Sequence, residues 1–178
     1  MDQRVKEILI DEQQITEKCK ELGAKISEDY KDVQPPLFVA LLKGSVPFLA
    51  DLIKYVTIDI EYDFMDVSSY AGTKSTGDIR IIKDLDRSIE GLDIVLVEDI
   101  VDTGRTLVNV KELLKNKGAK SIKVVSLLDK PSRREVEVEA EYIGFVIPDA
   151  FVIGYGLDFD QKFRNLPYVG IMKEEYYQ

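Results

Sequence analysis

Three acidic side chains and a loop suited to phosphate lie together in one short stretch of the sequence. Glu98 and Asp99 follow the apolar run 94–97, and Asp102 comes just before Thr103-Gly104-Arg105-Thr106. A helix beginning at that last segment would offer free backbone N–H groups to a phosphate, and its glycine would allow close approach. Paired carboxylates suit diol hydroxyls or Mg2+, and Asp102 is placed to move a proton. The stretch therefore predicts a site for a phosphorylated, hydroxyl-bearing ligand.

Each piece of this stretch also has an ordinary structural interpretation. An acidic pair after a strand is often a solvated loop, and Asp-Thr-Gly is a common turn and helix cap. The spacing differs from that of a Walker A loop and from that of a dinucleotide-binding fingerprint. It is the complete string 94–106, at one junction of strand, loop and helix, that favours a phosphate site.

The elements around this string predict an α/β fold with a central parallel sheet flanked by helices. Short apolar runs, typical of strands buried on both faces, occur at 37–42, 93–97 and 121–128. Periodicity predicts helices at 4–31 (with Asp11 able to start a second one), 46–54 and 107–116. Further strands are expected at 57–69, 79–83, 136–146, 150–155 and 169–172, and a solvated tail at 173–178. Because ligands bind at the carboxyl ends of parallel strands, the loops 43–45, 98–106 and 129–133 should surround the site.

Composition excludes several classes of function. A length of 178 residues suits a single domain, and a net charge of −9 disfavours nonspecific binding to nucleic acid. The absence of histidine excludes Ser-His-Asp catalysis and histidine-based zinc sites. The single cysteine, Cys19, allows no internal disulfide, so we expect a helix-packing role for it and a reducing, cytoplasmic setting. No apolar run approaches the ~20 residues of a membrane span, so no membrane partner is expected.

The 94–106 string resembles the phosphoribosyl pyrophosphate (PRPP) motif of the type I phosphoribosyltransferases, in the form typical of the hypoxanthine-guanine enzymes. The resemblance covers about residues 5–175. Leu41-Leu42-Lys43-Gly44-Ser45 is similar to the family's pyrophosphate loop, whose Lys–Gly peptide is typically cis. Ser68-Ser69-Tyr70 and the glycine-containing run after it resemble the closing lid, at about 68–78. Lys130 matches the lysine that reads the purine 6-oxo group. The segment 148–158 resembles the purine pocket and metal-site segment, and 163–166 resembles the stretch with a pyrophosphate-binding arginine.

The resemblance implies one domain over 1–178, with a core at about 35–150 and a small hood formed by the terminal segments, about 1–20 and 150–178. It implies that Asp102 is the general base or acid at purine N7. The implied phosphate and pyrophosphate ligands are Lys43, Gly44, Thr103, Gly104, Arg105, Thr106 and Arg164, and the implied ribose or metal ligands are Glu98 and Asp99. The implied purine-binding residues are Lys130, Phe151, Val152 and Asp158, and the lid residues are Ser69 and Tyr70. Mg2+ would be held by Glu98, Asp99 and Asp158.

The reaction implied is purine salvage: the 5-phosphoribosyl group of PRPP is transferred to hypoxanthine or guanine, giving IMP or GMP and pyrophosphate. The implied partners are PRPP and 6-oxopurine bases, without nucleic acid or membrane, in a homodimer or homotetramer. Two alternatives stay open, namely the same fold with a preference for xanthine and a regulator of the same fold that senses nucleotides and binds RNA or DNA. The charge of −9 argues against the regulator. Taken singly, Phe151 could be a core residue, and Lys43, Lys130 and Arg164 could be surface charges.

Overall fold

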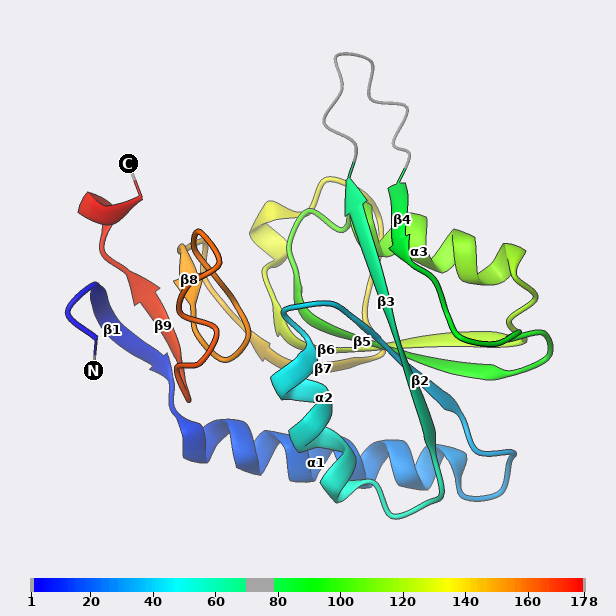
Figure 1. Ribbon diagram of the computed structural model, residues 1–178. Helices are drawn as coiled ribbons and strands as arrows, with labels where there is room; N and C mark the ends of the chain where they lie inside the picture. The colour runs from blue at the N-terminus through cyan, green and yellow to red at the C-terminus, as the bar shows by residue number, and fades with distance from the viewer. Residues whose placement is uncertain (1, 70–78, 178) are drawn as a thin grey trace.

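A computed structural model describes residues 2–69 and 79–177, and the strands within these residues form two sheets (Figure 1). Six of the described strands form the larger sheet, in the order β4-β3-β2-β5-β6-β7. They are β2 (Leu37–Leu41), β3 (Glu61–Ser69), β4 (Ile79–Lys83), β5 (Asp93–Val101), β6 (Ser121–Asp129) and β7 (Tyr142–Val146). The smaller sheet joins β1 (Val5–Ile10), β9 (Val169–Met172) and β8 (Val152–Ile153).

The larger sheet is parallel except at one edge. Five adjacent strands run parallel to one another, in the order β3, β2, β5, β6 and β7. The edge strand β4 pairs antiparallel with β3, and Ser69 lies opposite Ile79. The expectation of an α/β fold with a central parallel sheet flanked by helices is confirmed, and β4 adds an antiparallel strand at one edge. Fewer than a dozen residues separate β3 from β4, too few for the crossover connection that a parallel pair requires.

Helices cover both faces of the larger sheet. α1 (Glu12–Tyr30) and α2 (Val46–Leu52) pack on one face, and α3 (Arg105–Asn116) packs on the other (Figure 1). Alternate strand residues point to opposite faces, so Phe38 and Ala40 of β2 join the first core cluster while Val39 and Leu41 join the second. This double burial explains the continuous apolar runs. Cys19 is fully buried in α1, as expected for a packing residue.

Val5–Ile10, expected to lie in a long helix over 4–31, is a strand. Val5–Ile10 forms β1, which pairs antiparallel with β9 near the other end of the chain. α1 starts only after Asp11, whose side chain accepts a hydrogen bond from the Gln14 backbone N–H in a capping box. The helix start predicted at Asp11 is therefore confirmed. The pairing partner lies more than 150 residues away, from Ile10 to Val169, so local periodicity does not reveal it.

Other boundaries also differ from the sequence prediction. β5 continues through Val101, so 98–101 belongs to a strand and not to a loop, and α3 begins at Arg105. Residues 136–141 form no strand, and β7 starts at Tyr142. β8 is only two residues long, and β3 starts at Glu61. Short 3-10 turns at Ile53–Tyr55 (η1), Pro131–Arg133 (η2) and Glu174–Tyr176 (η3) complete the elements of the described chain.

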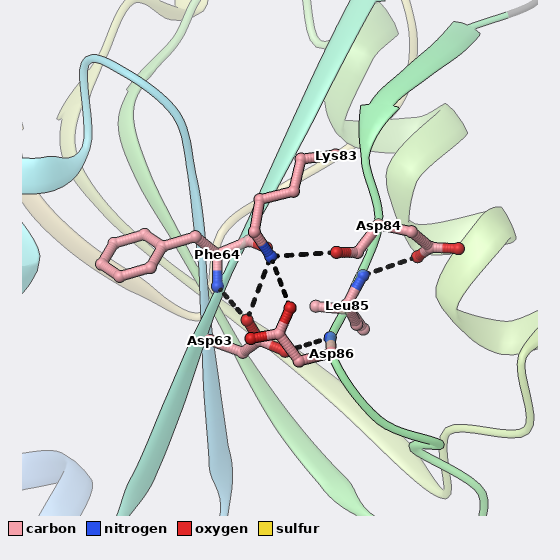
Figure 2. A network of polar contacts seen from close by, with 6 residues as sticks. All are labelled: Asp63, Phe64, Lys83, Asp84, Leu85 and Asp86. Carbon is pink, nitrogen blue, oxygen red and sulfur yellow. Dashed lines mark hydrogen bonds and ion pairs between the residues drawn. The ribbon is translucent and has the colours of Figure 1, made fainter.

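A polar network fastens the start of β3 to the end of β4 (Figure 2). The Lys83 ammonium donates to the backbone carbonyls of Phe64 and Asp84 and to the Asp86 carboxylate, each at 3.0 Å. The Asp63 carboxylate lies 3.5 Å from the same ammonium and accepts from the backbone N–H groups of Phe64 and Asp86. Asp63 is buried, so these partners offset the cost of removing its charge from water. The network therefore links β3, which ends at Ser69, to β4 and the turn after it.

The smaller sheet is assembled from both ends of the chain, which lie on the same side of the molecule (Figure 1). Its buried cluster consists of Val5, Ile153, Phe163 and Met172. Among residues 2–69 and 79–177, no helix is both long enough and apolar enough to cross a membrane.

Candidate active site

The turn between β5 and α3 has the geometry expected of a phosphate loop. Gly104 adopts a left-handed φ of 84° directly before the helix, a conformation that favours glycine. A Cβ atom at this position would come within 2.5 Å of the Val138 side chain. The first N–H groups of a helix have no carbonyl partner within it, so they are available to an anion. A small pocket of about 260 Å³ lies here, lined by Glu98, Asp99, Ile100, Val101, Asp102, Thr103, Gly104, Thr106 and Leu107.

The adjacent carboxylates Glu98 and Asp99 are held in a setting that disfavours their charges. Burial raises the pKa of Glu98 well above its ordinary value, and the neighbouring Asp99 charge adds to this. Burial likewise raises the pKa of Asp99 to about 6, although the backbone N–H of Ile100 and the charge of Arg164 act in the opposite direction. The Ile100 N–H donates to Asp99 Oδ1 at 2.7 Å. Perturbed carboxylates in a cleft are typical of a functional site.

Asp102 carries a buried oxygen that is available to accept a proton. Its Oδ1 atom has no hydrogen-bond partner in the described structure. The nearest cation is Arg133, whose Nε lies 3.6 Å away, an ion-pair distance but too long for a hydrogen bond. Arg134 donates to the Asp102 backbone carbonyl at 2.6 Å and also pairs with Asp129 at the end of β6. This pairing fixes the Asp102 backbone against the sheet while its carboxylate stays open.

On the other side of Asp99 lies the loop that follows β2. A Cβ atom on Gly44 would sit 1.6 Å from Asp99 Oδ2, so any other residue here would require the Asp99 side chain to move. The loop contains a cis peptide, as the resemblance implied, but it joins Leu42 to Lys43 and not Lys43 to Gly44.

Nearby, Arg164 pairs with Asp158 at 2.9 Å and donates to the Gly156 carbonyl at 2.7 Å. Because Arg164 and Asp158 both act on the pKa of Asp99, these groups belong to one charged cluster.

A larger pocket, of about 1070 Å³, adjoins Asp102. Its lining includes Lys130 and Phe151 together with Arg133 and the end of the chain, Glu174, Glu175 and Tyr177. Lys130 is buried, with its ammonium donating to the Ala150 carbonyl at 2.9 Å. Phe151 is 37% exposed, unusually open for a large aromatic ring, so a flat apolar surface faces this space. The pocket thus combines a proton acceptor, a cationic donor and a stacking surface.

Not every predicted residue reaches these pockets with its side chain. Arg105 is exposed and pairs with Glu135 at 2.6 Å, so only its backbone belongs to the phosphate loop. The side chain of Val152 is buried in the core, which leaves only its backbone for recognition. Ser69 ends β3, and Tyr70 lies outside the described residues.

Sequence reasoning missed several residues that line the larger pocket, including Arg133 and Tyr177. Arg133 approaches Asp102, and Tyr177 stacks on Phe151. Arg133 is next to another arginine just after Lys130, a basic cluster that could have drawn attention. Tyr177 lies in the tail expected to be solvated, and no local sequence signal marks it.

The carboxylates here fit a hard cation, which prefers oxygen ligands. Within residues 2–69 and 79–177, no group of three acidic, cysteine or histidine side chains is close enough to hold a metal on its own. Mg2+ commonly binds through one or two carboxylates and completes its shell with water and substrate phosphates. Burial raises the pKa of both Glu98 and Asp99, so a cation bound here would favour their charged forms. The donor set therefore fits Mg2+ arriving with a phosphorylated substrate.

Comparison with known proteins places this fold and site in a family. The family model of the phosphoribosyl transferase domain matches residues 6–160. A hypoxanthine-guanine phosphoribosyltransferase of Bacillus subtilis is 51% identical over 179 residues, covering 100% of this chain and 99% of that protein. The crystal structure of a hypoxanthine phosphoribosyltransferase from Staphylococcus aureus superposes with a TM-score of 0.94 at 50% identity, covering 98% of this chain and 95% of that one.

A more distant structure gives the same fold. Hypoxanthine phosphoribosyltransferase from Trypanosoma cruzi, in complex with the product IMP, has a TM-score of 0.94 at 38% identity and covers 99% of both chains. The expected family and fold are confirmed. The chain belongs to the phosphoribosyltransferase family, among its hypoxanthine-guanine transferases.

Proposed function

We propose that this protein salvages purines by transferring the 5-phosphoribosyl group of PRPP to hypoxanthine or guanine, releasing pyrophosphate. The observation that carries the proposal is the juxtaposition of two pockets at Asp102. The smaller one is lined by the phosphate loop, and the larger one by Lys130 and Phe151. Such an arrangement would hold a ribose phosphate and a purine on either side of one proton acceptor. The names of the similar proteins agree with this reaction.

On the purine side, the base would stack on the exposed ring of Phe151. Lys130 would donate a hydrogen bond to the 6-oxo group, and the Val152 backbone would contact the edge of the base. Adenine carries an amino group at this position, so it would present a donor to the buried lysine ammonium in place of the 6-oxo acceptor. Asp102 would take the N7 proton, since its buried Oδ1 has no hydrogen-bond partner among the described residues. The bond from ribose C1 to pyrophosphate oxygen breaks as the bond from C1 to the purine nitrogen forms.

On the PRPP side, residues 103–106 would hold the 5′-phosphate, with Arg105 contributing its backbone N–H. Lys43, Gly44 and Arg164 would hold the pyrophosphate, and Glu98 and Asp99 the ribose hydroxyls. Positive charge develops on the ribose ring as the pyrophosphate leaves, and buried carboxylates nearby would stabilise it. We further propose that a lid including Ser69 and Tyr70 excludes water from the reacting ribose.

We include Mg2+ in the proposal, held by Glu98, Asp99 and Asp158 directly or through water. When bound, it would neutralise charge on the departing pyrophosphate. Asp158 is at present paired with Arg164 at 2.9 Å, so its share of the metal would require that ion pair to loosen. Removing Mg2+ with a chelator should therefore abolish turnover.

A spectrophotometric assay with PRPP and Mg2+ tests the proposal, with hypoxanthine, guanine, xanthine and adenine offered in parallel. We expect turnover with hypoxanthine or guanine, little with adenine, and loss of turnover when the metal is chelated. A preference for xanthine would replace the proposed base specificity. Absence of turnover with every base would contradict the proposal and favour the nucleotide-sensing regulator. A regulator would also show salt-sensitive binding in a mobility-shift titration.

The organisation of the protein is also a proposal. We propose one domain over 1–178, with a core at about 35–150 and a hood from about 1–20 and 150–178, in a cytoplasmic homodimer or homotetramer. Exposed apolar side chains on the edge of the larger sheet, Tyr62 at 55% and Ile82 at 61%, support association of copies. Light scattering on the purified chain would measure its mass directly, and a monomer would contradict this part of the proposal.

A further inference from the structure

The final aromatic residue of the described chain stacks on the ring proposed to bind the purine. The ring centroids of Tyr177 and Phe151 are 4.6 Å apart, and their planes differ by only 19°. This is the geometry of a stacked aromatic pair. The sequence pattern predicted a solvated tail here, and the proposed reaction assigns no role to Tyr177. The stack of Tyr177 on Phe151 therefore needs an explanation of its own.

Backbone hydrogen bonds place Tyr177 in this position. β9 pairs with β8, and the Met172 N–H donates to the Phe151 carbonyl at 2.9 Å, which ties the start of the tail to the base of this ring. The 3-10 turn η3 then turns the chain back, through hydrogen bonds from Tyr176 to Lys173 and from Tyr177 to Glu174, each 3.1 Å long. The stack is therefore built into the fold of the chain end.

The stack leaves room for a ligand on Phe151. Tyr177 also packs against the buried cluster of the smaller sheet, which includes Met172, and it borders the same pocket as Phe151. Phe159 meets Phe151 nearly at right angles, at 87° and 5.7 Å. With both neighbours in place the Phe151 ring is still 37% exposed, and it lines the same pocket as Asp102 and Lys130. This exposure leaves part of Phe151 free to contact a ligand.

We propose that Tyr177 is a positioning residue for the purine, forming the rear layer of a stack Tyr177–Phe151–purine. The inference rests on the proposed function, because it takes Phe151 as the ring on which the base lies. Without Tyr177, Phe151 could rotate into the space behind it, and the base would lose a fixed surface. The effect is specific to the base, because in the described structure the phosphate-loop pocket shares only Asp102 with the larger pocket.

The test compares variants of Tyr177 by the KM for hypoxanthine and the KM for PRPP. Tyr177→Ala removes the ring, and Tyr177→Leu removes it while keeping apolar volume against the cluster, in case the smaller side chain disturbs folding. Tyr177→Phe keeps the stack, and Tyr176→Ala is the matched control, since it removes a 43% exposed tyrosine one position earlier. A stacked pair is worth ~0.5–1.5 kcal/mol, so the KM for hypoxanthine should rise about 2- to 12-fold in the Ala and Leu variants.

We expect the KM for PRPP to stay unchanged in these variants, and Tyr177→Phe and Tyr176→Ala to match the unmodified chain. An unchanged KM for hypoxanthine in Tyr177→Leu, or an equal rise in both KM values, would overturn the positioning role. A lower KM for hypoxanthine would also overturn it, because Tyr177 would then be occupying the place of the base. Absence of turnover in the unmodified chain would instead refute the proposed function, and this role with it.

Discussion

Replacing Asp99 with asparagine should stabilise the ligand-free protein while impairing the reaction. Burial raises the pKa of Asp99 from 3.8 to about 6, so the folded protein binds this proton more tightly than the unfolded chain does. Ionised Asp99 therefore destabilises the fold. The cost is absent below pH 3.8, grows between 3.8 and about 6, and is complete above 6. Asparagine has nearly the same shape, carries no charge, and can still accept from the Ile100 N–H.

The size of this effect follows from the pKa. Each tenfold change in proton affinity is worth about 1.4 kcal/mol, so a pKa raised from 3.8 to about 6 costs at most about 3 kcal/mol at neutral pH. This figure already includes the attraction of Asp99 to Arg164, because that attraction is one of the contributions to the shifted pKa. For a chain of 178 residues, each kcal/mol moves the melting temperature by about 2–4 °C. We therefore expect a rise of roughly 5 to 10 °C at about pH 7.5.

Thermal unfolding of the ligand-free protein, measured by calorimetry, is the assay. By linkage, the advantage of Asp99→Asn should be about 1.4 kcal/mol smaller at about pH 5 than at about pH 7.5. Asp93→Asn is the matched control at the other end of β5. Hydrogen bonds from Ser121 and Lys120 lower the pKa of Asp93, so removing this charge should lower the melting temperature. An Asp99→Asn variant that is no more stable, or equally stabilised at both pH values, would refute the reasoning.

Three further substitutions test the proposed roles. Asp102→Asn should lower kcat by about 100-fold or more, as expected for loss of a general base, with little change in KM; near-normal turnover would remove Asp102 from this role. Lys130→Ala should relax or abolish the preference for 6-oxopurines, measured as the ratio of kcat/KM for hypoxanthine and adenine; an unchanged ratio would place Lys130 outside the base pocket. Gly44→Ala should raise the KM for PRPP, since its Cβ would lie 1.6 Å from Asp99 Oδ2; an unchanged KM would show that the loop adapts.

The sequence predicted those features of the fold and site that depend on residues adjacent in the chain. The apolar runs around Val39, Leu96 and Val125 gave strands buried on both faces, because helices cover both sides of the sheet. The proposed phosphate loop could be predicted because Gly104 and its flanking threonines must be contiguous to build a helix N-terminus. Side chains from distant segments, such as Lys130 and Phe151, could be assigned to the same site only through the family resemblance.

What the sequence could not reveal depends on partners far along the chain. Val5–Ile10 has enough helical periodicity to extend α1, and only pairing with β9 makes it a strand. Residues 136–141 have strand-like alternation but pair with no strand among residues 2–69 and 79–177, so the alternation alone does not build one. The same limit applies to the tail, since the contact of Tyr177 with Phe151 depends on the pairing of β9 with β8.

The central claim is that this pocket transfers a phosphoribosyl group to a 6-oxopurine, and product analysis tests it most directly. The purified chain would be incubated with hypoxanthine, PRPP and Mg2+, beside the Asp102→Asn variant, and the products separated by chromatography and identified by mass. We predict IMP and pyrophosphate in equal amounts from the unmodified chain, and far less of both from the variant. PRPP that remains intact, or that is hydrolysed without forming IMP, would contradict the claim.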